Sequence, residues 1–351
     1  MYNVANKYKP FLHALDAIGS CLFFWTKWKK LESPRKILVI RLEHIGDCIL
    51  TTPTISALKE AFPNSSVDVL IRPANKIVFE NNSDVKEVLT INAPWFSRGS
   101  SVSYKELFSF VKQNFRKYDL VLDVHADPRN ILLAKLVGKF VVGKDIRGLG
   151  FLLNKTAEHD DKKHIIKQQL QLVEAVKSGS YPAKMSLFPK SSDLKKAESL
   201  LAGKERPFII INPGTGRPEK FWLNDRWAEL IGRLQKKPCG TIIFTGAPNE
   251  HIHVEEILKK TSPEHLDLVG KTSLGELFAV ASISDLIIAP DTGIIHAARA
   301  MGTKSIGLYG PVDPGIWGYN DGPNSSVIVR SSGKMEDITV DMVLECAERK
   351  L

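Results

Sequence analysis

Short, uninterrupted runs of apolar residues alternate with helix-length segments along most of this chain, and the alternation begins twice. The first series starts at residues 36–41 and the second at 208–211. A continuous apolar run of this length is typical of a strand that is buried on both faces of a parallel sheet. The pattern therefore predicts two α/β units, each with a parallel sheet between layers of helices.

The first series predicts strands at 36–41, 67–71, 87–91, 120–124 and 140–142, and helices at about 47–62, 104–115 and 164–176. The second predicts strands at 208–211, 241–245, 266–269, 285–289 and 304–309. It also predicts helices at 225–236, 249–260, 294–301 and 335–350, and a further helix that begins at about 274. We expect Asn224 or Asp225 to cap the helix at 225–236.

The length of 351 residues suits two domains. Residues 181–206 have a mixed pattern with Pro182 and Pro189, and we expect the connection between the domains there. The predicted organisation is an N-terminal extension at 1–35, a first Rossmann-like domain at 36–185 and a second at 186–351.

The formal net charge of +9 favours an anionic partner, such as a phosphorylated substrate, an anionic membrane surface or nucleic acid. A basic composition without any role is the plainer alternative. Basic residues interleaved with aromatic ones, as nucleic-acid-binding motifs have them, are not found, so we expect no nucleic-acid partner. The four cysteines form no C-x-x-C pair, which argues against a zinc site or a disulfide framework and fits a reducing, cytoplasmic compartment.

The first 35 residues form a segment of their own. Apolar residues are spaced as on one face of a helix, at Phe11, Leu12, Leu15, Ile18, Leu22, Trp25 and Trp28. Lys7 and Lys9 precede this stretch, and three lysines follow its aromatic end. Residues 10–28 are therefore a candidate for peripheral contact with the inner membrane. The alternative is a helix that packs on the protein's own body. Asp16 and His13 interrupt the apolar stretch, which argues against a signal peptide.

The first group of residues with chemical potential is the segment 41–53, where the first strand ends. Gly46 permits a tight turn and Asp47 follows at the start of the next helix. Asp47 is either an N-terminal helix residue favoured by the helix dipole or a base that takes a proton from a sugar hydroxyl. The turn lacks G-x-G-x-x-G, so NAD binding is disfavoured.

The second group is the loop 211–222, which follows the first strand of the second series. Gly214, Thr215 and Gly216 leave backbone N–H groups free to face an anion, and Lys220 adds a positive charge. The alternative is a solvated loop with a surface lysine. The Walker A pattern is not matched.

The third group is the segment 289–296, where another strand ends and a helix begins. The N–H groups of Thr292, Gly293 and Ile294 are expected to point at an anion, with support from the helix dipole. Asp291 would repel a phosphate, so its expected role is to hold a sugar hydroxyl or the loop itself. His296 is either structural or part of this site.

Other polar residues after strands are weaker candidates. His44, Asp123 and Asp127 follow strands of the first series and are candidates for contact with an acceptor. His251 and His253 form an H-x-H on an exposed helix and are a poor candidate for a metal site. The chain has no D-x-D triplet, so a metal-bridged diphosphate site is not indicated, and we expect neither a metal nor a cofactor.

Together, the segments 37–53, 212–222 and 291–296 resemble glycosyltransferase family 9, the heptosyltransferases of lipopolysaccharide core synthesis. The segment 302–311 also fits this pattern. The resemblance implies a GT-B fold and inverting transfer of heptose from ADP-heptose to a cell-surface glycolipid without a metal. It places Asp47 on the family's proposed base, Thr215 and Lys220 on its phosphate loop, and Asp291, Thr292, Gly293 and His296 on its donor motif.

Two features depart from that pattern. Glu43 stands where relatives often have a basic or small residue, and the N-terminal extension precedes the usual first strand. The expected function is therefore a glycosyltransferase with a nucleotide-sugar donor and an anionic glycolipid acceptor. The alternatives are a GT-B transferase or epimerase that uses another nucleotide sugar, and a non-catalytic nucleotide-binding scaffold.

Overall fold

A computed structural model describes residues 9–96, 104–236, 240–262, 264–319, 327–330 and 333–351. The chain divides into two compact units, Met1–Met185 and Ser186–Leu351. In the described residues, each unit contains a six-stranded sheet in which every pair of neighbouring strands is parallel. Lys7 and Cys239 lie outside the described residues.

The sheet of the first unit has the strand order β3-β2-β1-β4-β5-β6. Its strands are β1 (Lys36–Arg41), β2 (Ser66–Ile71), β3 (Glu87–Thr90), β4 (Tyr118–Asp123), β5 (Gly138–Gly143) and β6 (Lys155–Thr156). This order is that of a Rossmann-like sheet, in which the chain reverses direction across the sheet between β1 and β4.

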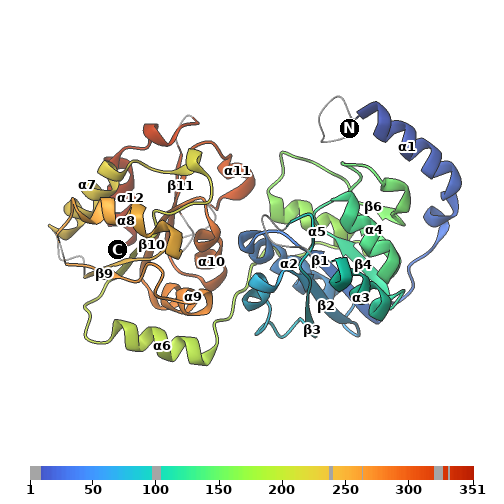
Figure 1. The fold of residues 1–351 in the computed structure, drawn as a ribbon, viewed down its shortest axis with the longest axis horizontal. Coiled ribbons are helices and arrows are strands. Elements are labelled where there is room, and N and C mark those ends of the chain that lie inside the picture. Colours follow the sequence, from blue (N-terminus) through green and yellow to red (C-terminus); the bar gives the residue numbers. More distant parts are fainter. Residues whose placement is uncertain (1–8, 97–103, 237–239, 263, 320–326, 331–332) are drawn as a thin grey trace. The chain divides into compact units, whose positions relative to one another are not determined.

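Helices cover both faces of this sheet (Figure 1). They are α2 (Ile45–Ala61), α3 (Tyr104–Asn114), α4 (Pro128–Val137) and α5 (Ile165–Glu174). Helix α2 packs against α5, and α3 packs against α4. Right-handed crossovers from β1 to β2 and from β4 to β5 run in opposite directions along the sheet, so α2 and α4 lie on opposite faces.

The second unit repeats this architecture with the strand order β12-β11-β10-β7-β8-β9. Its strands are β7 (Phe208–Ile211), β8 (Thr241–Phe244), β9 (Leu266–Asp267), β10 (Leu286–Pro290), β11 (Ser305–Tyr309) and β12 (Val327–Arg330). Here the reversal lies between β7 and β10. The sheet is again of the Rossmann type.

The helices of the second unit are α6 (Ser191–Leu201), α7 (Asn224–Gln235), α8 (His251–Leu258), α9 (Leu274–Ile283), α10 (Gly293–Met301), α11 (Pro314–Trp317) and α12 (Val340–Lys350). Helix α7 packs against α8 and α12, and α9 packs against α6 and α10. The sheet thus separates two helical layers, as in the first unit (Figure 1).

Most of the predicted elements are confirmed, because the buried strands are continuous apolar runs. The mixed pattern at 181–206 concealed α6, which buries only Ala197 and Leu201 fully. Strand β12 and the short helix α11 were also not predicted. The expected cap of α7 is wrong: Leu223 is the N-cap, without a side-chain cap bond. Asn224 instead donates to Glu256 of α8 at 2.7 Å, and Asp225 pairs with Lys260.

The N-terminal segment forms helix α1 (Lys9–Leu22) and a short 3-10 helix, η2 (Phe24–Trp28). Both contact a further 3-10 turn of the first unit, η4 (Gly150–Leu152). Asp16 accepts a hydrogen bond from the backbone N–H of Leu149 at 2.9 Å. In the described part of the chain, no helix has the length and apolarity needed to cross a bilayer.

Candidate active site

The predicted site residues gather where each sheet changes direction. In doubly wound sheets, ligands bind beyond the carboxyl ends of the strands at this switch point. In the first unit the switch point lies between β1 and β4; Asp47 lies in the segment that follows β1, and Asp123 is the last residue of β4. In the second unit it lies between β7 and β10, and the segments that follow carry Lys220 and Asp291.

Asp47 lies in the first turn of α2, where the sequence analysis places it. Its carboxylate Oδ1 is 2.9 Å from Nη2 of Arg41, the last residue of β1, and its side chain is 18% exposed. Arg41 is buried and also pairs with Glu43, at 3.0 Å. The guanidinium therefore fixes the orientation of the Asp47 carboxylate. His44 is the N-cap of α2 by backbone position, without a side-chain cap bond, and it is exposed.

His125 joins this charged group from the end of β4, and the sequence analysis did not select it. Nδ1 of His125 contacts the carboxylate of Glu43, and Nε2 lies 2.7 Å from Nη1 of Arg147. Burial and the positive charges of Arg41 and Arg147 lower the pKa of His125 to about 3. The imidazole is therefore neutral. Because a guanidinium only donates, Nδ1–H donates to Glu43 and Nε2 accepts from Arg147.

Asp123 and Asp127 hold the turn between β4 and α4. Asp123 is fully buried, and it accepts hydrogen bonds from the backbone of His125 and from Asn130, both at 3.3 Å. Burial raises the pKa of Asp123 to about 7. Asp127 is the N-cap of α4 and pairs with Arg129 at 2.7 Å. Both carboxylates hold this turn, and their contact with an acceptor stays a prediction.

In the second unit, the structure brings the two predicted donor segments together. Nζ of Lys220 lies 2.6 Å from Oδ2 of Asp291 and 3.2 Å from the Asp291 carbonyl oxygen. Their side chains are 13% and 8% exposed. Helix α10 begins two residues after Asp291, at Gly293, with Thr292 as N-cap. The lysine therefore lies beside a helix N-terminus, where backbone N–H groups and the helix dipole favour an anion.

Asp291 and His296 also form contacts inside the unit. The buried hydroxyl of Tyr309 hydrogen-bonds to Asp291, which contributes to the strongly raised pKa of this tyrosine. Nδ1 of His296 lies 2.7 Å from the hydroxyl of Tyr319, and Nε2 lies 3.9 Å from Asp291. Of the two roles expected for Asp291, the geometry shows that it holds the loop. His296 is buried, and its imidazole lies next to that carboxylate.

The loop after β7 is anchored at both ends. Asn212 donates to the Thr245 carbonyl oxygen at 3.0 Å, and Trp222 is fully buried and donates to the Ile338 carbonyl oxygen at 2.9 Å. A Cβ on Gly214 would lie 2.1 Å from Cδ of Glu250, so this glycine allows the close approach. Between the anchors, Thr215 is half-buried and Gly216 is exposed.

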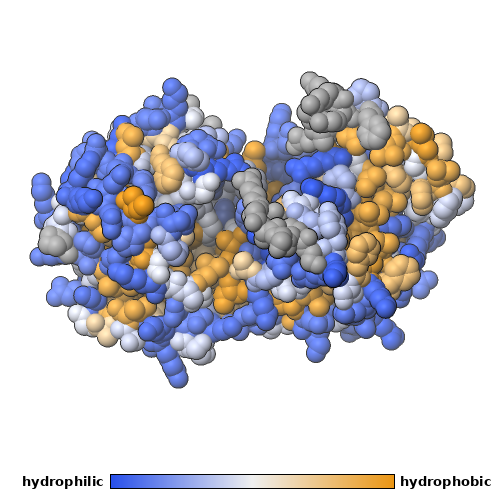
Figure 2. All heavy atoms as spheres, viewed as in Figure 1, coloured by the Kyte–Doolittle hydropathy of each residue, from blue (hydrophilic) through white to orange (hydrophobic). Residues whose placement is uncertain are grey.

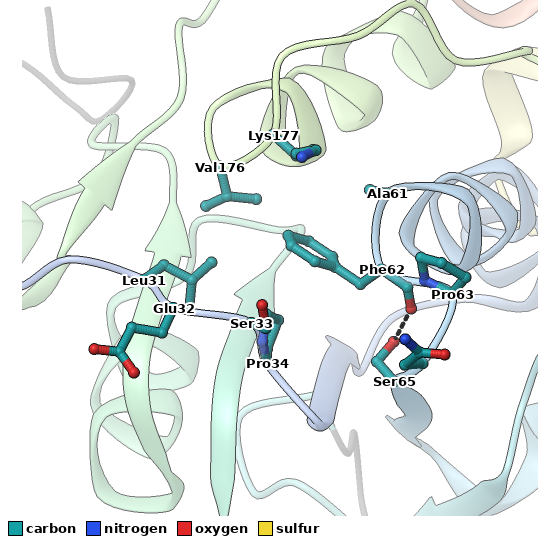
Figure 3. A pocket seen from close by; sticks show the side chains of 11 residues that line it. Leu31, Glu32, Ser33, Pro34, Ala61, Phe62, Pro63, Ser65, Val176 and Lys177 are labelled. Atoms are coloured by element: carbon teal, nitrogen blue, oxygen red, sulfur yellow. Dashed lines mark hydrogen bonds between the residues drawn. The ribbon is translucent and has the colours of Figure 1, made fainter.

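Two remaining features do not belong to the site. His251 pairs with Glu255 at 3.2 Å, and the ring of His253 packs at a tilt against that of Phe221. An open hollow of about 420 Å³ lies beside the segments that precede β1 and β2, at the opposite edge of the first sheet. Figure 3 shows Phe62 and Val176 beside it, with the Ser65 hydroxyl donating to the Phe62 carbonyl oxygen at 2.7 Å.

The signals for the missed residues were present in the sequence. Arg41 ends β1 and Glu43 follows it, His125 follows β4, and Arg147 follows β5, all at the carboxyl edge of one sheet. Glu43 was noted only as a departure from the family pattern. A search for complementary charges after adjacent strands would have found this group.

Two Rossmann-like units with charged groups at both switch points define a GT-B glycosyltransferase, and known proteins agree with this class. A family model described as glycosyltransferase family 9 (heptosyltransferase) matches residues 108–347. A lipopolysaccharide core heptosyltransferase of Haemophilus influenzae is 24% identical over 292 residues, covering 81% of both chains. Lipopolysaccharide heptosyltransferase 3 of Escherichia coli is also 24% identical, over 79% of this chain and 83% of that protein.

Solved structures show the same fold. A family 9 glycosyltransferase from Veillonella parvula has a TM-score of 0.80 and 21% identity, over 91% of this chain and 97% of that one. The E. coli heptosyltransferase WaaC, solved with ADP, has a TM-score of 0.73 and 21% identity, over 90% of this chain and all of that one. The chain belongs to glycosyltransferase family 9, the heptosyltransferases, and the predicted GT-B fold and glycosyltransferase class are confirmed.

Proposed function

We propose that this enzyme transfers a heptose from ADP-heptose to a lipopolysaccharide core or related anionic glycolipid acceptor, with inversion and without a metal ion. The observation that carries this proposal is the contact of Lys220 with Asp291 directly before helix α10. It combines a cation, a glycine-containing loop and a helix N-terminus at one switch point.

The donor half of the proposal rests on charge. A nucleoside diphosphate gains negative charge as it leaves the anomeric carbon, and Lys220 together with the first N–H groups of α10 would stabilise that charge. The structural relatives support the choice of nucleotide, since WaaC was solved with ADP and with ADP-2-deoxy-2-fluoro heptose. Because the chain also has no D-x-D triplet, we assign the role that a metal has in other transferases to Lys220 and these N–H groups.

The acceptor half rests on Asp47. Its carboxylate would take the proton from an acceptor hydroxyl while the hydroxyl oxygen forms a bond to the anomeric carbon. The bond from that carbon to the diphosphate oxygen breaks in the same step, which inverts the configuration. The Arg41 guanidinium holds the Asp47 carboxylate in a fixed orientation for this proton transfer.

The proposal is tested by offering the purified enzyme a panel of nucleotide sugars and an isolated core glycolipid acceptor, with and without a chelator. We expect release of ADP only from ADP-heptose, unchanged by the chelator, and a product of inverted anomeric configuration. Turnover only with a different nucleotide sugar would contradict ADP-heptose as the donor. Nucleotide binding without turnover would indicate a non-catalytic scaffold.

The role of Asp47 has a matched control. We expect Asp47→Asn to lower kcat by about 100- to 10,000-fold, as loss of a general base does, while ADP affinity stays unchanged. Asp341 also lies in the first turn of a helix, α12, and is 80% exposed, so Asp341→Asn should leave kcat unchanged. Equal rates for the two variants would show that Asp47 is not the base.

A further inference from the structure

The N-terminal segment is attached to the first unit along one side only. Gly19 packs so closely against the ring of Phe151 that a Cβ there would lie 2.4 Å from the ring. Thr26 donates to the Phe151 carbonyl oxygen at 3.0 Å, and Asn154 donates to the Thr26 carbonyl oxygen at 2.7 Å. These contacts, with that of Asp16, fix α1 and η2 on the first unit and determine which side chains face outward.

The outward side of this segment is apolar and aromatic. Trp28 is 74% exposed, Ile18 is 61% exposed and Trp25 is 54% exposed. Phe24 packs edge-on against Trp28, with ring centroids 5.0 Å apart. The segment therefore packs on the protein's own body, as one alternative from the sequence predicts, and it still presents an apolar face. Its contact with a membrane stays a prediction. Figure 2 shows hydrophobic residues gathered where Figure 1 draws α1.

Lysines and an arginine from three other parts of the first unit surround the base of this segment. Nζ of Lys29 donates to the carbonyl oxygen of Lys139 at 2.7 Å. Lys135 of α4 is close enough to Lys27, Lys29 and Arg116 for electrostatic interaction. On α4, Lys135 lies between Leu132, which is 50% exposed, and Leu136, which is 36% exposed. Two exposed leucines of α4 therefore flank a lysine that belongs to the same group of cations.

The positive charges of this group of cations repel one another. Burial, followed by the charges of Arg116, Lys29 and Lys27, lowers the pKa of Lys135 to about 8. Burial and the charges of Arg116 and Lys139 also lower the pKa of Lys29. Asp119 pairs with Lys139 at 2.9 Å and offsets only part of this charge. An anionic surface would relieve the repulsion that remains.

We infer that this face, made of the outward side of α1 and η2 with Leu132, Leu136 and the bordering cations, docks the enzyme on an anionic lipid bilayer. Tryptophan and phenylalanine side chains enter the headgroup region, while lysines at the same level bind lipid phosphates. A second copy of the chain fits this face less well. A two-fold interface sets a patch against itself, and would bring one cation border against the other.

Vesicle binding tests this inference with the full-length protein. Vesicles of phosphatidylcholine alone are compared with vesicles that also contain phosphatidylglycerol, in a flotation assay without acceptor or donor. We expect binding only to the anionic vesicles and weaker binding in high salt. Because no turnover is measured, the result is independent of the proposed function. Absence of binding to anionic vesicles would overturn the inference.

Two double variants locate the surface. Trp25→Ala with Trp28→Ala should weaken vesicle binding by roughly tenfold or more, since two large exposed aromatic side chains are lost. Lys29→Gln with Lys135→Gln should weaken it by roughly 25-fold, about fivefold for each charge near the lipid. Because the lysines repel each other, the charge variant should melt at or above the wild-type temperature.

Matched controls come from exposed residues of the second unit. Phe188→Ala with Ile252→Ala and Lys195→Gln with Lys259→Gln should bind vesicles as the wild type does. Equal loss in controls and test variants would overturn the inference. A wild-type dimer in light scattering that Trp28→Ala dissociates, without vesicle binding by either protein, would assign the face to a second copy instead.

Discussion

The ammonium of Lys220 lies 2.6 Å from the carboxylate of Asp291, although 71 residues separate the two in the chain. Lys220 lies in the loop between β7 and α7, and Asp291 is the first residue after β10. The pair therefore joins the two segments at the switch point of the second sheet. It holds a positive charge beside the N-terminus of α10 before any ligand arrives.

Removing this charge should weaken binding of the leaving group. We expect Lys220→Ala to lower kcat/KM by about 100- to 1,000-fold, as the loss of one preorganised charge does. Steady-state kinetics with a nucleotide-sugar donor measures this change. Lys271 is exposed and also pairs with an aspartate, so Lys271→Ala serves as the control that should keep wild-type rates. Near-wild-type kcat/KM for Lys220→Ala would remove Lys220 from the site.

Removing the partner should affect folding as well as turnover. Asp291→Asn removes the carboxylate that pairs with Lys220. The lysine side chain is only 13% exposed, so its charge loses this partner in a largely buried place. Unpaired, largely buried charges cost several kcal/mol, so we expect a loss of about 2 kcal/mol in the free energy of unfolding. Bound ADP should restore part of this stability in urea denaturation, because the diphosphate replaces the carboxylate as partner. Equal stability of variant and wild type without ADP would contradict the structural role.

Arg41 is expected to position Asp47 rather than to touch substrate. Arg41→Gln removes the guanidinium that lies 2.9 Å from Asp47 and should lower kcat by about tenfold or more, with little change in KM. Arg41→Lys should restore part of the rate, because it returns a positive charge next to Asp47. A rate for Arg41→Lys no higher than that of Arg41→Gln would indicate a role in folding alone.

His125 should make the protein less stable in mild acid. Its pKa in the folded protein is about 3, against an ordinary value of 6.5. The unfolded chain therefore binds the proton first, and the stabilising contribution is complete above pH 6.5 and lost as the pH falls toward 3. Between pH 6.5 and 5 this loss is about 2 kcal/mol. His125→Gln should remove it from urea denaturation at these two pH values, whereas an unchanged loss would place the effect elsewhere.

Asp123 should make the protein less stable as the pH rises, which is the opposite of the effect expected for His125. Its pKa in the folded protein is about 7, against an ordinary value of 3.8. The folded state therefore keeps the proton longer, and the stabilising contribution is complete below pH 3.8 and lost as the pH rises through 7. Between pH 4.5 and 7 this loss is about 3 kcal/mol. Asp123→Asn, which retains an acceptor, should be more stable than the wild type at pH 7. Equal stability there would contradict this assignment.

The sequence predicted the strands well because each one is a continuous apolar run, as at Phe208–Ile211, where all four residues are buried. It also placed Asp47, Lys220 and Asp291 after strands, where ligands of such sheets bind. Prediction failed where side-chain partners come from another element. Asn224 has a good capping side chain, yet it contacts Glu256 of α8 instead. Asp123 ends β4 and is fully buried, with partners in the turn that follows, which the sequence pattern did not indicate.

The sequence by itself determined which segments are buried and in what order strands and helices alternate, because hydrophobic periodicity is a local property of the chain. Tertiary structure alone decided which charges meet. Arg41 pairs with both Glu43 and Asp47, His125 joins them from another strand, and Lys220 finds Asp291. The physical reason is that a parallel sheet brings together strand ends that lie far apart in the sequence, and only their spatial order decides which side chains become neighbours.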